Sequence, residues 1–170
     1  MLVLDATPLI YLAKAGVLQK LESLEEDLIV PYEVYHEVVV EGKEAGEADA
    51  LLMENLAETE VLEVREVEGG ELYQKLESDR YLSDADREVL SIAEEESGIA
   101  VVDEEHARSV ADMEGMENRG TVYLLFRLLD LGVMDAGEVR ETVDGMIEAG
   151  WYCSTDLYSK ILRELEEHDN

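Results

Sequence analysis

Short apolar segments alternate along the chain with longer segments in which apolar residues recur every three or four positions. Residues 1–4, 28–30 and 99–102 are apolar without alternation, which is typical of strands buried on both faces of a parallel sheet. Residues 61–67 alternate in part and predict a strand nearer the sheet edge, and residues 118–121 predict a short strand or turn. Because predicted strands alternate with predicted helices, the sequence indicates one α/β domain with a mostly parallel sheet.

In each predicted helix the apolar residues recur at a helical spacing, so that they would form one apolar face. They cover residues 8–15, 17–24, 31–39, 48–57, 72–76, 83–96, 106–113, 122–131, 135–149 and 155–167. Residues 83–96 are the clearest case, because Ser83 and Asp86 have the spacing of a capping box and Gly98 ends the helix. Thr7 is predicted to cap the first helix and Pro8 to be its first residue.

Composition adds an unusual charge to this picture. The 170 residues include 43 Asp and Glu against 13 Lys and Arg, which gives a net charge of −30. Such a surface repels phosphate backbones and anionic lipids, so it argues against a purely electrostatic binder of nucleic acid or membrane. Most of the charge is interpreted as a halophile-like surface suited to high salt, where screening acts over roughly 3 Å at 1 M. A few acids in particular positions could instead hold cations.

Other features bound the class of protein. The single cysteine, Cys153, excludes an intramolecular disulfide and suits a reducing cytosol, so a cytoplasmic location is expected. No apolar run approaches the roughly 20 residues of a membrane span, and the first residues lack the basic region of a signal peptide. The chain shows no internal boundary. Residues 1–170 are therefore expected to form a single domain, with the C-terminal helices of about 135–168 as an extension packed on it.

Four acids are placed where they could meet. Asp5 and Asp103 end the two most apolar strands, Asp86 lies in the first turn of a helix, and Glu37 lies two turns into the helix opened by Pro31. Acids at the ends of neighbouring strands lie roughly 5–10 Å apart, since adjacent strands are about 4.8 Å apart. Clustered carboxylates repel unless a cation neutralises them, and Mg²⁺ and Mn²⁺ prefer oxygen ligands. Taken singly, each acid is explained as well by a strand end, a helix cap or a solvated surface.

Five segments in order resemble motifs of the PIN domains, metal-dependent ribonucleases that include VapC-type toxins. They are residues 4–10 (LDATPLI), 30–37 (VPYEVYHE), 82–93 (LSDADREVLSIA), 101–108 (VVDEEHAR) and 119–121 (RGT). The tail from Gly132 to Leu162 is similar to one PIN subgroup whose roles are poorly defined. The resemblance spans nearly the whole chain and implies a three-layer α/β/α sandwich with four to five strands.

The resemblance also implies a set of site residues. Asp5, Glu37, Asp86 and Asp103 would be the catalytic and metal-binding quartet, holding Mg²⁺ or Mn²⁺. The supporting residues would be Thr7, Asp84, Glu104, Arg108 and Thr121. Asp84 could replace Asp86, Glu104 could add a ligand beside Asp103, and Arg108 would be structural or would orient a phosphate.

The function implied is hydrolysis of RNA phosphodiesters by an endoribonuclease. The chain could be the toxin of a toxin–antitoxin pair, with an antitoxin protein as partner, or could form a homodimer. The alternative is a PIN-fold binding or regulatory module without catalysis. Phosphatases of the haloacid-dehalogenase type need a second acid where Thr7 stands, and receiver domains need paired acids and a late lysine, so both classes fit poorly.

Overall fold

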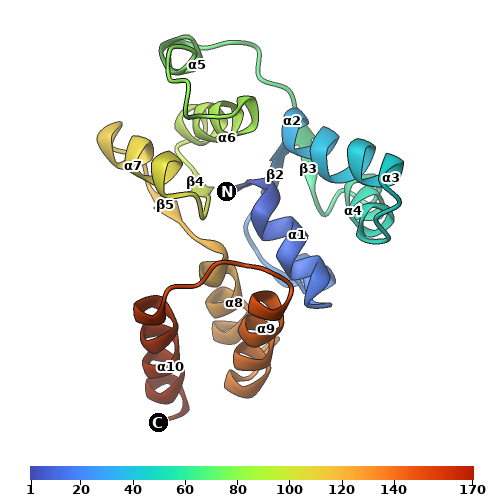
Figure 1. Ribbon diagram of the computed structural model, residues 1–170, viewed down its shortest axis with the longest axis vertical. Helices are drawn as coiled ribbons and strands as arrows, with labels where there is room; N and C mark the ends of the chain where they lie inside the picture. Colours follow the sequence, from blue (N-terminus) through green and yellow to red (C-terminus); the bar gives the residue numbers. More distant parts are fainter. The chain divides into compact units, whose positions relative to one another are not determined.

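The computed structural model describes all 170 residues, which form two compact units (Figure 1). One unit comprises residues 1–10 and 25–121 and carries the whole sheet. The other comprises residues 11–24 and 122–170 and is helical. Each unit is described by itself below.

The sheet unit is built on five parallel strands in the order β3-β2-β1-β4-β5. The strands are β1 (Leu2–Leu4), β2 (Leu28–Pro31), β3 (Glu63–Arg65), β4 (Ile99–Val101) and β5 (Asn118–Arg119). The apolar central strand β1 is fully buried between β2 and β4, whereas the edge strand β3 is half-buried to exposed. Both observations follow from the sequence, since β1 is uniformly apolar and β3 alternates with charged residues. The predicted α/β class and the edge position of residues 61–67 are confirmed.

Helical segments connect the strands, and the connections run first towards one edge of the sheet and then towards the other. The helical segments of this unit are the start of α1 (Ala6–Lys14), α2 (Tyr32–Tyr35), η2 (His36–Glu41), α3 (Gly42–Glu44), α4 (Asp49–Glu58), α5 (Glu71–Leu76), α6 (Asp84–Glu95) and α7 (Glu105–Met113). The chain runs from β1 outward to β3, then returns to β4 and continues to β5. Right-handed crossovers in opposite directions place helices on both faces of the sheet, which makes the three-layer sandwich. Helix α6 packs on β1, β2 and β4.

The strand order reverses between β1 and β4. Ligands of open α/β sheets bind at the carboxyl ends of the strands, at the point where the strand order reverses. Asp5 follows the last residue of β1, and Asp103 follows β4 after one intervening residue. The topology therefore brings the first and last of the four predicted acids to the same edge.

Two predicted helices differ from the structure. Helix α1 begins at Ala6, so Thr7 lies in the first turn and does not cap it; the carboxylate of Asp5 caps instead, with Oδ1 accepting the Ala6 N–H at 2.8 Å. Aspartate is at least as good a capping residue as threonine. Residues 18–23 form a 3₁₀ helix, η1 (Leu18–Ser23), rather than an α-helix. Apolar spacing alone does not separate the two types in so short a segment.

The helix after Pro31 contains a feature that was not predicted. It is helical from Tyr32 to Glu44, but residues 36–41 have the wider π-helical hydrogen-bonding pattern. A π segment contains no proline or glycine signal and keeps buried valines, Val38 and Val39, on its inner side. Such segments occur often at functional sites, and this one contains Glu37.

The helical unit consists of η1, the end of α1 and three longer helices. These are α8 (Thr121–Asp130, in this unit from Val122), α9 (Ala136–Glu148) and α10 (Thr155–Asp169). Helix α9 starts with a capping box between Asp135 and Glu138, and α10 is capped by Ser154. Helices α9 and α10 pack against each other (Figure 1). None of the helices in either unit has the length and apolar character needed to cross a membrane.

Candidate metal centre

Asp5 is the centre of the candidate site. Its side chain is buried at the end of β1, and its N–H donates to the Val101 carbonyl oxygen at 3.1 Å, which ties the end of β1 to β4. Burial raises the pKa of Asp5 to about 7, against the lowering effect of the Ala6 N–H. This value includes smaller increases from the nearby carboxylates of Asp86, Glu37 and Asp103. Asp5 is thus a buried acid whose negative form lacks a compensating positive charge among these neighbours.

Asp103 is held in place by Thr121. The backbone N–H of Thr121 donates to Oδ1 of Asp103 at 2.7 Å, and its hydroxyl donates to Oδ2 at 2.5 Å. Thr121 is fully buried at the start of α8, directly after β5. Both carboxylate oxygens of Asp103 thus accept a hydrogen bond from Thr121, which lies 18 positions later in the chain.

Gly120 completes this arrangement. A Cβ atom at position 120 would lie 2.8 Å from Oδ1 of Asp103, a distance that real Cβ contacts essentially never show. It would also lie 3.7 Å from Nη1 of Arg108. Only glycine therefore leaves the Asp103 carboxylate where Thr121 holds it.

Asp86 has a local role and a place in the cluster. As predicted, it forms a capping box with Ser83: its N–H donates to Ser83 Oγ at 3.0 Å, and its Oδ2 accepts the Ser83 N–H at 2.9 Å. The side chain is buried, and its charge acts on Asp5 and on Glu37. The local explanation of this acid and its place at the candidate site are therefore compatible.

Glu37 reaches the cluster from the π segment. Its side chain is largely exposed, but surrounding protein atoms remove part of its hydration, and this loss is the main cause that raises the pKa of Glu37. The carboxylates of Glu41 and Asp86 raise it further. Glu37 is thus the most solvent-accessible of the four acids at this edge.

The structure brings these four acids into one electrostatic cluster, the carboxylate quartet of Asp5, Glu37, Asp86 and Asp103. As the side chains lie, no three Asp, Glu, His or Cys side chains converge closely enough to hold a metal ion. The donor set still suits a hard cation, since it offers only carboxylate oxygens and concentrates uncompensated negative charge around a buried aspartate.

A family model described as a PIN domain (DUF3368) matches residues 1–167. The chain belongs to the PIN-domain family. A search of curated proteins finds no match to this chain. The resemblance stated from the sequence motifs is confirmed, and the PIN fold is a nuclease-type fold.

Three supporting residues of this PIN domain have local partners. Asp84 is exposed and pairs with Arg87 at 2.6 Å, on the outer side of α6. Glu104 caps α7, accepting the Ala107 N–H at 2.8 Å. The partner of Arg108 is Asn118.

Arg108 belongs to a polar network behind the site. Its Nε donates to Oδ1 of the buried Asn118 at 3.1 Å, and Nδ2 of Asn118 donates to Oδ1 of Asp112 at 2.7 Å. This network fixes β5, which leads into Gly120 and Thr121. Thr7 is half-buried in the first turn of α1, beside Asp5 in sequence.

The sequence interpretation missed one buried acid, Glu88. Only 9% of its surface is exposed, and its Oε2 accepts the N–H of Glu33 at 3.0 Å. Pro31, at the N-cap of α2, supplies no side-chain cap, so α6 caps α2 through Glu88. Burial raises the pKa of Glu88. The sequence signal that could have identified Glu88 is its place directly before the apolar Val89 and Leu90 in the helix predicted at residues 83–96.

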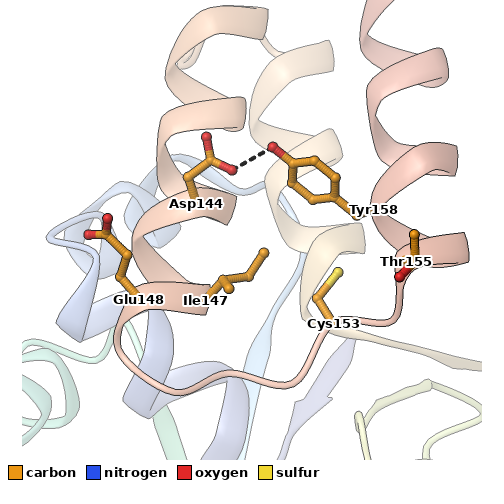
Figure 2. Close-up of a pocket in the computed structure, with 6 residues that line it drawn as sticks. All are labelled: Asp144, Ile147, Glu148, Cys153, Thr155 and Tyr158. Carbon is orange, nitrogen blue, oxygen red and sulfur yellow. Dashed lines mark hydrogen bonds between the residues drawn. The ribbon is translucent and has the colours of Figure 1, made fainter.

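The helical unit contains a separate pocket of about 530 Å³. Figure 2 shows its lining residues, which are Asp144, Ile147, Glu148, Cys153, Thr155 and Tyr158. The Tyr158 hydroxyl donates to Oδ1 of Asp144 at 2.6 Å. Burial raises the pKa of the Cys153 thiol, which disfavours the reactive thiolate. The pocket contains none of the predicted site residues.

Proposed function

We propose that this PIN domain is a Mg²⁺- or Mn²⁺-dependent endoribonuclease that hydrolyses RNA phosphodiesters at the carboxylate quartet. The observation that carries the proposal is the environment of Asp5. A buried aspartate whose pKa is raised to about 7 by burial and three neighbouring acids is an unfavourable arrangement in the absence of positive charge. Its position at the carboxyl end of β1, where the strand order reverses, is where this class of sheet binds ligands.

The carboxylate oxygens of the quartet are the ligands that a hard divalent cation prefers, and each residue would have a distinct part. Asp5 supplies the buried central ligand, and Asp103 supplies a ligand whose direction Thr121 and Gly120 fix. Asp86 keeps Oδ2 for the Ser83 cap, while Glu37, the most exposed of the four acids, would be a ligand open to solvent. Two such cations are equally compatible with four carboxylates.

The chemistry proposed is in-line displacement at phosphorus. When bound, the cation activates a water and stabilises the leaving oxygen of the phosphodiester. The residues of the chain contribute ligands in fixed directions, and Thr7 contributes a hydroxyl beside Asp5. Because the quartet alone would repel a phosphate, placement of the scissile phosphate at the quartet is expected to require the cation.

Mn²⁺ titration tests the ligand assignment. Isothermal titration of Mn²⁺ at high salt should show binding to the wild type that is lost or reduced at least tenfold in Asp5→Asn. Glu148→Gln, in the helical unit, is the matched control and should bind as the wild type does. Equal binding by the wild type and Asp5→Asn would refute the assignment.

RNA cleavage tests the enzyme assignment separately. Wild-type protein should cleave RNA with Mg²⁺ or Mn²⁺, cleavage should stop with a chelator, and Asp5→Asn should be inactive. Normal metal binding with no cleavage of any RNA would favour the alternative, a PIN-fold binding or regulatory module.

We further propose, on the basis of the family resemblance, that this protein is the cytoplasmic toxin of a toxin–antitoxin pair. Induced expression of the wild type should arrest growth, and Asp5→Asn should not. An antitoxin would be a protein that reverses the arrest when co-expressed and co-purifies with the chain. A homodimer is a separate proposal, to be tested by light scattering.

A further inference from the structure

An exposed tyrosine between α5 and α6 stands in a cluster of aromatic and cationic side chains. Tyr81 has 67% of its surface exposed. The guanidinium of Arg80 lies over the Tyr81 ring, 5.0 Å from its centroid, and also donates to the Tyr81 hydroxyl at 2.9 Å. The ring of His106 meets that of Tyr81 edge-on, with centroids 5.7 Å apart and an angle of 71°. These three residues are termed the Tyr81 cluster.

The Tyr81 cluster is fixed in place by its surroundings. One oxygen of Asp79 accepts the Tyr81 N–H at 2.9 Å, and the other lies 2.8 Å from Nε2 of His106. Arg87, on α6, donates to the carbonyl oxygens of Leu76 and Asp79 at 3.1 and 3.0 Å. The exposed ring therefore sits on an ordered turn, and a ligand that stacks on it would immobilise little additional chain.

Short stretches of chain connect the Tyr81 cluster to two acids of the carboxylate quartet. His106 is three residues after Asp103, and three residues span at most about 11 Å of extended chain. Tyr81 is two residues before Ser83, whose amide is held by Asp86. The cluster thus lies at the N-terminal ends of two helices. Helix α6 contains Asp86, and helix α7 follows Asp103.

The Tyr81 cluster also answers a difficulty of charge. A chain of net charge −30 attracts a phosphate backbone poorly, so ordinary electrostatic binding of RNA is weak. Stacking of a base on an aromatic ring needs no net positive charge, and Arg adds a cation–π contribution. Arg80 provides a positive guanidinium next to the ring, opposite in sign to the neighbouring Asp79 and to the net charge of the chain.

We infer that the Tyr81 cluster is a stacking site for a base of single-stranded RNA, next to the carboxylate quartet. The inference rests on the proposed ribonuclease function and adds a contact residue for the substrate, since an unpaired base offers its face to an aromatic side chain. The site positions the strand beside the quartet through the base and reads no sequence.

Binding of a fluorescein-labelled oligoadenylate of ~12 nucleotides tests the inference. Anisotropy would be measured at about 1 M salt, where screening removes most of the repulsion. The Asp5→Asn background prevents cleavage. In this background Tyr81→Ala should weaken binding about 5- to 150-fold, the range expected for loss of one stacked base, whereas Tyr81→Phe and Tyr81→Trp should retain it. The control is Tyr152→Ala, because Tyr152 is 85% exposed in the helical unit and should not affect binding.

Two further measurements separate this inference from the proposed function. In otherwise wild-type protein, Tyr81→Ala should raise KM for RNA with little change in kcat, and Mn²⁺ titration should be unchanged. Equal RNA affinity of Tyr81→Ala and Tyr81→Phe, or no RNA binding in the Asp5→Asn background, would overturn the stacking site. Either result would leave the metal assignment to be decided by Mn²⁺ titration of wild type and Asp5→Asn.

Discussion

Thr121 donates two hydrogen bonds to Asp103, one from its backbone N–H at 2.7 Å and one from its hydroxyl at 2.5 Å. The two residues lie at the ends of different strands, since Asp103 follows β4 and Thr121 follows β5. Charge-assisted bonds of this kind are stronger than neutral ones and fix direction as well as distance. The direction in which Asp103 presents its carboxylate is therefore set by the neighbouring strand.

Thr121→Val removes only the hydroxyl bond and keeps the shape of the side chain. A hydrogen bond to a charged group contributes about 1.5–3 kcal/mol, so the free energy of unfolding should fall by about that amount. Mn²⁺ affinity should fall several-fold, because Asp103 gains freedom to rotate. Denaturant unfolding and calorimetric titration measure the two effects. Thr121→Ser should restore both, and a Val variant with wild-type metal affinity would contradict the positioning role.

Gly120→Ala places a Cβ atom against Oδ1 of Asp103, at 2.8 Å before any adjustment. We expect the carboxylate to turn away from Thr121, with a loss of Mn²⁺ affinity of tenfold or more and a stability loss of about 1–3 kcal/mol. Gly145→Ala is the matched control, because the nearest atom to a Cβ there is at 4.0 Å. That variant should keep metal affinity and gain about 0.4–1 kcal/mol of stability. Equal metal affinity in the two variants would argue against the steric explanation.

Asp5 predicts a particular dependence of stability on pH. Its pKa is 3.8 in its ordinary state and about 7 in the folded protein, so the folded state binds the extra proton between these values. Stability from this group is therefore greatest below pH 4 and is lost as pH rises towards 7. One pKa unit corresponds to 1.36 kcal/mol, so the loss is at most about 4 kcal/mol. The contribution of Asp5 is isolated by comparing the unfolding free energies of the wild type and Asp5→Asn from pH 4 to 8. A difference that stays constant over this range would refute the predicted pH dependence.

The same proton competes with metal. Mn²⁺ affinity of the wild type should rise up to about tenfold per pH unit below pH 7 and level off above it, because binding releases the Asp5 proton. Titration calorimetry in buffers of different ionisation enthalpy measures the released proton directly. Metal binding with no proton release at pH 6 would contradict this coupling.

Glu88 predicts that α6 stabilises the start of α2. In Glu88→Ala the Glu33 N–H loses its partner, which costs about 1–3 kcal/mol for a group shielded from water. Glu88→Gln keeps an acceptor oxygen and should lose less than half of that. Hydrogen exchange at the Glu33 amide should accelerate in the Ala variant only. Unchanged exchange in Glu88→Ala would show that the bond does not hold α2.

Much of the sheet unit follows from simple sequence rules. Uniformly apolar segments identified the three central strands, partial alternation identified the edge strand at residues 63–65, and Ser83 with Asp86 identified the start of α6. These features depend on neighbours in sequence and on burial, which residue types report directly. The meeting of Asp5 with Asp103 was predictable because parallel strands share a carboxyl edge.

Other features depend on contacts that residue types do not report. Helix α1 begins at Ala6, and nothing in the residue types favours Asp5 over Thr7 as its cap. The π segment around Glu37 has no distinguishing residue pattern. The cap that Glu88 provides to α2 joins residues 55 positions apart, in different elements.

The position of β1 in the sheet has a consequence for biosynthesis. The strand that carries Asp5 is made before its partner, since Leu2 pairs with Ile99, and at about 5–20 residues per second the 97 residues that follow Leu2, up to Ile99, take roughly 5–20 s to be added. Until then the nascent chain holds Asp5 without Asp103 beside it. A polypeptide that ended before residue 121 would lack both Asp103 and its partner Thr121, or Thr121 alone, and so would not assemble the proposed centre.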